Sequence, residues 1–376
     1  MKFRVERDVL ADAVTWTARS LPTRPPVPVL AGVRLEAEPD GSLHLSSFDY
    51  EVSARATVAA EVTEPGVVLV SGRLLAEISR SLPDKPVDLS LDGTKVTLTC
   101  GASRFSLLTM PVEEYPNLPT MPAATGTLDG DLLTQAVAQV TVAASRDDTL
   151  PLLTGVRVEM EGEKVTLLAT DRYRLALREL VWRPVSPGVS QVALVRARTL
   201  TDVAKTLGSS GEVTVALSDT GGVDLIGFEV GGRRTTSLLV DGDYPPVRRL
   251  FPDETPIHAV VDRHALVDAT KRVALVAERN TPVRLSFSDG QVQLDAGQGD
   301  DAQASEAIEA SLVGEEISVA FNPSYLLDGL GAIDTPFVRL AFTHPTKPVE
   351  FTGQVEASGD DIRDYRYLLV PIRFAG

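Results

Sequence analysis

The sequence predicts an α+β protein built from three tandem repeated domains of roughly 125 residues each. Two observations support this fold class. A short alternating strand followed by an amphipathic helix occurs three times, and a second strand–helix unit follows in each third of the chain. The helices of the second unit begin near Arg73, Arg198 and Pro323, so both intervals between them are 125 residues.

The first strand–helix unit starts at Phe3, Gly126 and His258. In each copy an aspartate or arginine opens the helix, and apolar residues then recur every three or four positions, which is the spacing of one helix face. The residues expected on these faces are Val9, Leu10, Ala13, Val14, Leu132, Leu133, Ala136, Val137, Leu266, Val267, Thr270 and Val273.

Alternating, β-rich sequence lies between the helices, and Gly, Asp and Asn interrupt it as in hairpins. Two repeats end alike, with PVEEYPNLP at Pro111 and DGDYPPVRRLFP at Asp241. The proline-rich residues 116–122 and 245–256 therefore read as linkers. The predicted domains are residues 1–120, 121–252 and 253–376. Periodicity alone also fits three duplicated domains that form no larger assembly.

Composition narrows the class of protein. The single cysteine, Cys100, rules out an internal disulfide and fits a reducing cytoplasm. No run approaches the roughly 20 apolar residues of a membrane span, and the charges in the opening MKFRVERD argue against a signal peptide. No metal site is expected, because metal-ligand spacing is lacking among His44, His258, His264 and His344.

The net charge of −16 argues, taken alone, against a nucleic-acid partner. The six predicted helical segments nevertheless hold 14 basic and 14 acidic residues, so the whole excess of acid lies elsewhere. A neutral, arginine-bearing helical face could contact phosphates weakly while an acidic exterior repels DNA. Scattered arginines on ordinary solvated helices fit equally well. Charge alone leaves both interpretations open.

Seven segments, in the same order, resemble the bacterial DNA polymerase III beta subunit, or sliding clamp. LLATDRYRLALRE at residues 167–179 is the most specific of them, and VEEYP, DDTLP and ERNTPVRL are similar to clamps of high-GC Gram-positive bacteria. The other matches are RPPVPVLAGVRLE at Arg24, RDDTLPLLTGVRVE at Arg146, DGDYPPVRRLFP at Asp241, RVALVAERNTPVRL at Arg272, FNPSYLLDGL at Phe321 and YLLVPIRFAG at Tyr367.

The resemblance implies the DNA-clamp fold, closed head-to-tail into a homodimeric ring with helices lining the lumen and sheets outside. It implies a cytoplasmic, non-enzymatic processivity factor that needs no cofactor and contacts no membrane. Such a ring encircles double-stranded DNA without reading its sequence. Its other expected partners are the replicative DNA polymerase, the clamp loader and further proteins that carry a clamp-binding motif.

The resemblance also implies roles for individual residues. A partner-peptide pocket between the second and third domains is expected from Leu153, Thr170, Arg172, Tyr173, Arg174, Leu175, Pro245, Arg249, Leu250, Asn322, Tyr325, Val370, Pro371, Ile372 and Arg373. The residues expected to face DNA are Arg24, Arg73, Arg80, Arg196, Arg198 and Lys205. The residues expected at the dimer interface are Phe105, Leu107 and Leu275. Taken singly, Leu153, Leu175 and Leu250 also fit ordinary core positions.

The sequence departs from the family at the expected pocket. Family tails usually carry methionines, whereas this tail reads Val370, Pro371, Ile372, Arg373 and Phe374. Since β-branched side chains are stiffer than methionine, partner selectivity is expected to differ. An alternative interpretation is therefore a second, specialised clamp whose altered pocket selects partners or tolerates a pocket-binding inhibitor. A further departure is Arg196, because related clamps often carry proline there.

Two other classes of function compete with the clamp. No phosphate-binding loop, dinucleotide fingerprint or paired-histidine metal motif is present, and acidic pairs such as Asp147 with Asp148 and Asp300 with Asp301 are typical of solvated loops. An enzyme is therefore not expected. The second rival is a scaffold of tandem domains with no DNA inside, from which a closed homodimer would distinguish the clamp.

Overall fold

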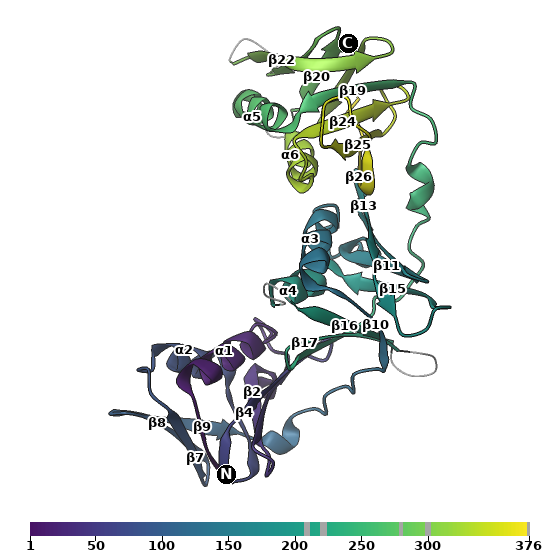
Figure 1. Ribbon diagram of the computed structural model, residues 1–376. Helices are drawn as coiled ribbons and strands as arrows, with labels where there is room; N and C mark the ends of the chain where they lie inside the picture. Colours follow the sequence, from purple (N-terminus) through teal and green to yellow (C-terminus); the bar gives the residue numbers. More distant parts are fainter. Residues whose placement is uncertain (207–210, 219–223, 278–280, 298–301, 374–376) are drawn as a thin grey trace. The chain divides into compact units, whose positions relative to one another are not determined.

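The computed structural model describes residues 1–206, 211–218, 224–277, 281–297 and 302–373 (Figure 1). Contacts divide the chain into two compact units. The first comprises Met1–Asp131, Arg183–Ser186 and Lys205–Leu239, and the second comprises Leu132–Trp182, Pro187–Ala204 and Val240–Gly376. Each unit is organised around one sheet in which every described strand pair is antiparallel.

The sheet of the first unit runs in the order β14-β10-β16-β17-β18-β4-β3-β2-β6-β9-β8-β7-β1-β5. Its strands are β1 (Lys2–Val5), β2 (Gly32–Ala37), β3 (Ser42–Phe48), β4 (Val52–Ala59), β5 (Glu61–Glu64), β6 (Gly66–Ser71), β7 (Val87–Asp92), β8 (Lys95–Cys100), β9 (Ser103–Met110), β10 (Ala124–Asp129), β14 (Arg183–Pro184), β16 (Glu212–Leu217), β17 (Leu225–Val230) and β18 (Arg233–Leu238).

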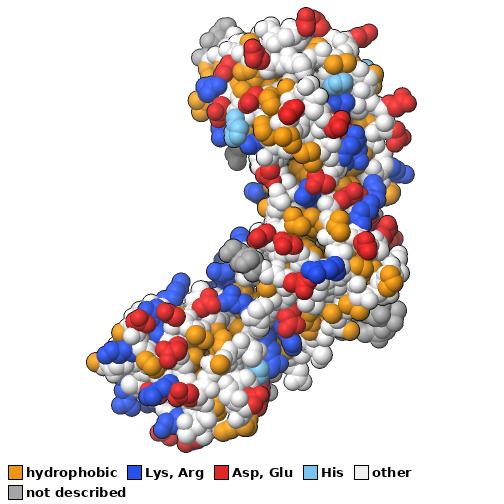
Figure 2. All heavy atoms as spheres, viewed as in Figure 1, with side chains coloured by type: hydrophobic (Ala, Val, Ile, Leu, Met, Phe, Trp, Pro, Cys, Tyr) orange, Lys and Arg blue, Asp and Glu red, His pale blue; other side chains and the backbone are white. Residues whose placement is uncertain are grey.

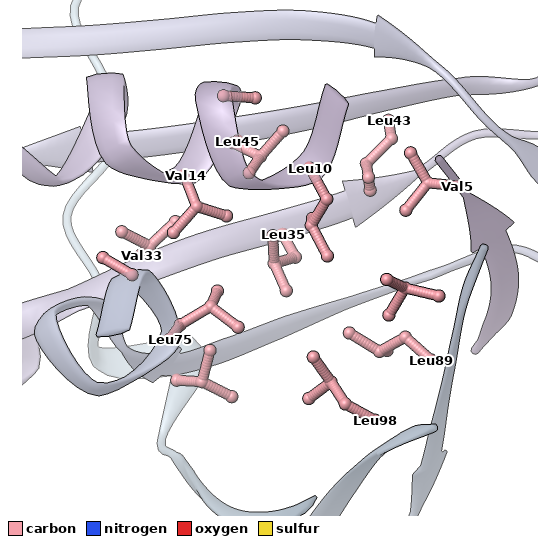
Figure 3. Close-up of a cluster of buried hydrophobic side chains, with 14 of the residues drawn as sticks. Val5, Leu10, Val14, Val33, Leu35, Leu43, Leu45, Leu75, Leu89 and Leu98 are labelled. Atoms are coloured by element: carbon pink, nitrogen blue, oxygen red, sulfur yellow. The ribbon is translucent and has the colours of Figure 1, made fainter. Parts of the chain in front are cut away.

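Helices α1 (Arg7–Ala18) and α2 (Gly72–Ser81) pack against each other on one face of this sheet. Figure 3 shows Leu10 and Val14 of α1 and Leu75 of α2 extending toward strand residues such as Leu35, all of them buried. The predicted apolar face of α1 is confirmed except at Val9, which is 39% exposed. Burial of this aliphatic core is the main force that holds the helices on the sheet.

The sheet of the second unit runs in the order β15-β11-β12-β13-β26-β25-β24-β19-β22-β21-β20-β23. Its strands are β11 (Gly155–Glu161), β12 (Lys164–Thr170), β13 (Arg174–Val181), β15 (Ser190–Arg196), β19 (Ile257–Asp262), β20 (Val283–Ser288), β21 (Gln291–Ala296), β22 (Ala304–Val313), β23 (Ile317–Phe321), β24 (Phe337–Phe342), β25 (Val349–Gln354) and β26 (Ile362–Leu369).

The remaining α-helices of the described residues lie wholly or almost wholly in the second unit. They are α3 (Gly130–Thr141), α4 (Ala197–Thr206), α5 (Arg263–Val273) and α6 (Pro323–Ala332). Two tyrosines of β26 reach helices on one face of the sheet: the Tyr365 hydroxyl donates to the carbonyl of Gln139 in α3 at 3.2 Å, and Tyr367 donates to that of Tyr325 in α6 at 2.8 Å. In α3, Leu132 is 42% exposed rather than buried as predicted.

The predicted strand–helix repeats are confirmed, because α2, α4 and α6, the second helix of each repeat, begin within one residue of the predicted starts. The strands of the three repeats hydrogen-bond into two sheets. The central part of the sequence supplies β10, β14, β16, β17 and β18 to the first sheet and β11, β12, β13 and β15 to the second. Hydrogen bonding of β18 to β4 and of β13 to β26 joins neighbouring repeats into two continuous sheets.

Short 3-10 turns connect several of these elements. The turns are η1 (Pro28–Ala31), η2 (Val112–Glu114), η3 (Pro151–Thr154), η4 (Val247–Leu250) and η5 (Ala274–Val276). Of these, η4 lies inside the linker predicted at residues 245–256. Within the described residues, no helix is long and apolar enough to cross a membrane.

Candidate partner-binding site and basic surface

The turn between β12 and β13 is rigidly hydrogen-bonded. Asp171 Oδ1 accepts from the backbone N–H groups of Tyr173 at 3.0 Å and Arg174 at 3.1 Å. The Thr170 hydroxyl donates to the carbonyl of Arg174 at 2.6 Å and accepts from the N–H of Arg172 at 3.1 Å. Arg172 adopts φ +79°, a conformation that costs a non-glycine residue energy and persists only where neighbours enforce it. The turn thus presents Arg172 and Tyr173 to solvent.

Arg174 fastens this turn to α6. Its buried guanidinium donates to Asp171 Oδ2 at 3.0 Å and to Asp328 Oδ2 at 2.5 Å, and lies 4.2 Å from the ring centroid of Tyr325. Burial works to lower the pKa of Arg174, but its bond to Asp328 and the nearby Asp171 outweigh burial and raise that pKa. The exposed ring of Tyr173 stacks on Tyr325 with centroids 6.2 Å apart. The guanidinium thus contacts the ring of Tyr325, and Tyr173 stacks on that ring.

A leucine-rich cluster lies on the face of the sheet opposite the helices. It contains the buried Leu153, Leu175 and Leu368 together with Tyr244. The hydroxyl of Tyr244 accepts from the backbone N–H of Thr170 at 3.0 Å, and burial raises the pKa of this phenol above its ordinary value. Through Tyr244, the segment after β18 contacts the β12–β13 turn, which α6 also contacts through Asp328.

The C-terminal tail crosses this region in an extended form. Backbone N–H groups of Val370 and Ile372 donate to the carbonyls of Tyr173 at 2.9 Å and Ala320 at 2.7 Å. Pro371 is buried between them, whereas Val370 and Ile372 remain 38% and 36% exposed. Phe374 lies outside the described residues.

The predicted pocket residues divide by exposure. Those with buried side chains are Leu153, Thr170, Arg174, Leu175 and Pro371. Those that are partly or fully exposed are Arg172, Tyr173, Pro245, Arg249, Leu250, Asn322, Tyr325, Val370, Ile372 and Arg373. Asn322 has an additional structural role, because its side-chain oxygen caps α6 by accepting from the N–H of Ser324 at 2.9 Å.

Sequence reasoning missed the contacts that fix the segment around Leu250. Arg366 of β26 lies 4.0 Å from the ring centroid of the buried Phe251 and is paired with the buried carboxylate of Glu350. Arg248 donates to Thr166 at 3.2 Å on β12. The one feature of the sequence that hinted at these contacts was the alternation of charged residues along the strands. Such alternation does not show which distant segments pair.

Three of the predicted DNA-facing residues lie near α2 in the first unit. Arg73 donates to the carbonyl oxygens of Pro22 at 3.3 Å and Thr23 at 3.4 Å, and Arg24 is the residue after Thr23. Arg80 donates to the carbonyl of Ala76 at 3.1 Å. Arg24, Arg73 and Arg80 are exposed. These contacts hold two guanidinium groups along the solvent side of α2.

The other predicted basic residues are associated with α4. Arg196 ends β15 and is half-buried, while Arg198 and Lys205 are exposed in the first and last turns of α4. Figure 2 shows basic and acidic side chains interspersed over the visible face. Contact with phosphates through such scattered charges is weak and carries no sequence information.

Each sheet has a strand with an unpaired stretch of edge within the described residues. Residues 103–108 of β9 pair with β8 alone, and residues 304–309 of β22 pair with β21 alone. Phe105 is half-buried, and Leu275 in η5 is 84% exposed. Leu107 differs from expectation, because strand alternation turns its side chain into the core at 4% exposure and turns Leu108 outward at 69%.

No cluster of three His, Cys, Asp or Glu side chains that could hold a metal ion occurs in the described part of the chain. Asp147 serves a turn instead: its Oδ1 accepts from the hydroxyl of Thr149 at 2.7 Å and from its N–H at 2.9 Å, and these bonds lower the pKa of Asp147. The pair Asp300 and Asp301 lies outside the described residues.

Comparisons with known proteins match one family in all three parts of the chain. Models of the N-terminal, central and C-terminal domains of the DNA polymerase III beta subunit match residues 1–119, 127–246 and 248–364. The beta sliding clamp of Streptomyces coelicolor is 59% identical over 377 residues, covering 100% of both chains. That of Micrococcus luteus is 60% identical over 312 residues, covering 83% of this chain and 100% of the relative.

A solved DNA polymerase sliding clamp from Bacillus subtilis superposes with a TM-score of 0.92 at 25% identity, covering 100% of both chains. The architecture is thus the three-domain α+β clamp fold. The chain belongs to the DNA polymerase III beta subunit family, the beta sliding clamps, which are non-catalytic processivity factors of DNA replication.

Proposed function

We propose that this clamp subunit closes head-to-tail with a second copy into a ring around duplex DNA, and that partners dock a short peptide at the β12–β13 turn. The observation that supports the ring is that β9 in the first unit and β22 in the second each leave residues along one edge unpaired. An unpaired edge is a template for another strand, and two different edges give a heterologous contact that can close. In this arrangement β9 of one copy adds to β22 of the other.

Side chains beside the two edges support this pairing. Leu108 is 69% exposed near the β9 edge, and Leu275 is 84% exposed in the turn after α5. Arg104 on β9 and Glu309 on β22 are exposed, and neither forms an ion pair within the described residues. The facing edges therefore offer apolar area and opposite charge. Together with half-buried Phe105, they form the proposed subunit contact.

The ring holds DNA by topology rather than by affinity. Arg24, Arg73, Arg80, Arg198 and Lys205 supply exposed positive charge near α2 and α4, while the chain carries a net charge of −16. Weak phosphate contacts exchange quickly and keep the ring mobile, and Arg196 adds to them. The clamp loader opens and recloses one interface.

The proposed peptide partner is apolar with acidic neighbours. Four large apolar side chains at the site remain exposed: Tyr173, Leu250, Val370 and Ile372. Arg172, Arg249 and Arg373 are also exposed and form no ion pair among the described residues. An anchoring leucine or phenylalanine would bury the apolar area, and an adjacent carboxylate would meet the guanidinium groups. We assign this peptide to the replicative DNA polymerase, the loader and other motif-bearing proteins.

We further propose domain limits at residues 1–120, 121–252 and 253–376, and a cytoplasmic location. An ordinary clamp is favoured over a specialised copy, because relatives named as beta sliding clamps are 59% identical over 377 residues and 60% identical over 312 residues. In that case Val370 and Ile372 in the tail affect which peptides bind, and they do not give the protein a separate function.

Retention on circular DNA tests the ring. The protein is incubated with nicked circular DNA, a clamp loader and ATP, and the circle is then cut. Retention on the intact circle and release after linearisation are expected. Equal, salt-sensitive binding to both forms would show a surface DNA binder, and absence of binding would favour the scaffold.

Peptide titration tests the site separately. Leu250→Ser is expected to weaken binding of a short peptide that carries leucine, phenylalanine and aspartate by about tenfold, since one buried anchor contact contributes roughly 1–2 kcal/mol. Val192→Ser is the matched control, because Val192 is 51% exposed on β15, away from the turn, and Leu250 is 52% exposed. Equal effects of the two variants would contradict the assignment.

A further inference from the structure

The turn between β3 and β4 in the first unit has the same construction as the β12–β13 turn. The non-glycine residues with left-handed backbone among those described are Tyr50, at φ +76°, and Arg172, at φ +79°. Each follows an aspartate whose Oδ1 accepts from the N–H groups two and three positions later, at 2.9 and 2.6 Å for Asp49 and at 3.0 and 3.1 Å for Asp171. A costly conformation repeated in the same setting identifies the two turns as copies.

The surroundings are copied too. A Cβ atom on Gly32 would lie 2.5 Å from Leu69 Cδ1, and one on Gly155 would lie 2.6 Å from Leu194 Cδ1. Both glycines therefore permit the same close approach of a 3-10 turn to a strand.

The following strand closes both turns in the same way. The N–H of Leu238 donates to the carbonyl of Glu51 at 2.9 Å, and that of Val370 donates to Tyr173 at 2.9 Å. The first-unit turn therefore stands in the same relation to β18 as the proposed peptide site does to β26.

The two copies differ in the side chains at the ends of the paired strands. In the second unit, Thr170 pairs with Leu175, and the threonine hydroxyl is folded back into the turn. In the first unit, Phe48 pairs with Ser53. The ring of Phe48 is 8% exposed and packs among Val29, Leu30, Leu69 and Tyr115.

Phe48 thus places an apolar ring where the second-unit turn carries a small hydroxyl. Tyr50 covers that ring in an edge-on contact with centroids 5.7 Å apart. Beneath it, the hydroxyls of Ser53 and Thr236 are 2.6 Å apart, where the second unit has Leu175 beside Leu368. The first-unit copy is filled by its own chain.

We propose that the β3–β4 turn is a second copy of the partner-peptide site, closed by the side chain of Phe48. This inference rests on the proposed function of the β12–β13 turn. Phe48 fills the place of the apolar peptide anchor, so each chain offers one peptide site instead of two. Removing the ring and supplying the leucine floor would create a second site for the same class of ligand, a short peptide with apolar anchors and acidic neighbours.

The test exchanges the residues of the two copies in the full-length protein. The probe is a ten-residue peptide with leucine, phenylalanine and aspartate, and calorimetry gives its number of sites per chain. The variant Phe48→Thr, Ser53→Leu, Thr236→Leu is expected to bind two peptides, the unchanged protein one, and Thr170→Phe none. Combining all four substitutions is expected to leave one site. A photoreactive form of the peptide should label the segment around Tyr50 only where Phe48 is absent.

Circular dichroism and thermal unfolding confirm that each variant is folded, and Phe48→Leu, which keeps an apolar side chain, is the control expected to retain one site. The proposal is overturned if the folded triple variant still binds one peptide, or if the unchanged protein binds two. Unchanged binding by Thr170→Phe would instead refute the proposed second-unit site. If the unchanged protein binds none, one new site in the triple variant supports the closure by Phe48, and none refutes it.

Discussion

Replacing Arg174 by methionine tests the central feature of the peptide site. The substitution keeps side-chain length but removes the donors to Asp171 and Asp328 and the cation beside Tyr325. Breaking a buried ion pair costs about 3–5 kcal/mol. Asp171 retains two backbone donors, and the side chain of Asp328 is already 42% exposed, so water replaces part of the loss. We therefore expect a destabilisation of about 2–3 kcal/mol.

Thermal unfolding should show this loss as a fall in Tm of about 5–10 °C. Peptide affinity should also fall about tenfold, because Tyr325 loses a cation–π partner worth roughly 0.5–2 kcal/mol. The matched control is Arg178→Met, four residues along the same strand, where a buried guanidinium pairs with Asp364. It should lower Tm without changing affinity. Equal affinity losses in both variants, or none in Arg174→Met, would refute the reasoning.

Three further predictions concern the interface, the packing and the pH dependence. Leu275→Asp places a charge at an 84%-exposed apolar position and should convert the proposed dimer to monomer in analytical ultracentrifugation; an unchanged dimer would count against the interface. Gly32→Ala brings a Cβ to 2.5 Å from Leu69 Cδ1 and should lower the free energy of unfolding, measured with denaturant, by about 1–3 kcal/mol. An unchanged free energy of unfolding would show that the leucine moves aside and would contradict this prediction. Burial, followed by the charge of Arg55, lowers the pKa of His44 from 6.5, so protonation opposes folding and stability should decline as pH falls through that region. His44→Gln should flatten this decline in Tm measured between about pH 7 and 5, and an unchanged slope would contradict the assignment.

Local sequence patterns were sufficient to predict the helices, the strands and their repetition. Apolar spacing located the helices, and the 125-residue interval between Arg73, Arg198 and Pro323 revealed the repeat. Helix and strand periods are local properties of the chain, so they can be recognised without knowledge of distant contacts. Helical periodicity wrongly predicted burial of Val9 and Leu132, because each helix presents that apolar side chain to solvent.

Contacts between residues distant in the sequence could not be predicted and became visible in the folded chain. Arg174 meets Tyr325 and Asp328 across 151 and 154 positions, and nothing local to either segment specifies that pairing. The same holds for Phe48, whose burial depends on Val29 and Tyr115 rather than on its own strand. Long-range side-chain contacts depend on sheet register and on which strands become neighbours, and these are set by the packing of the whole unit.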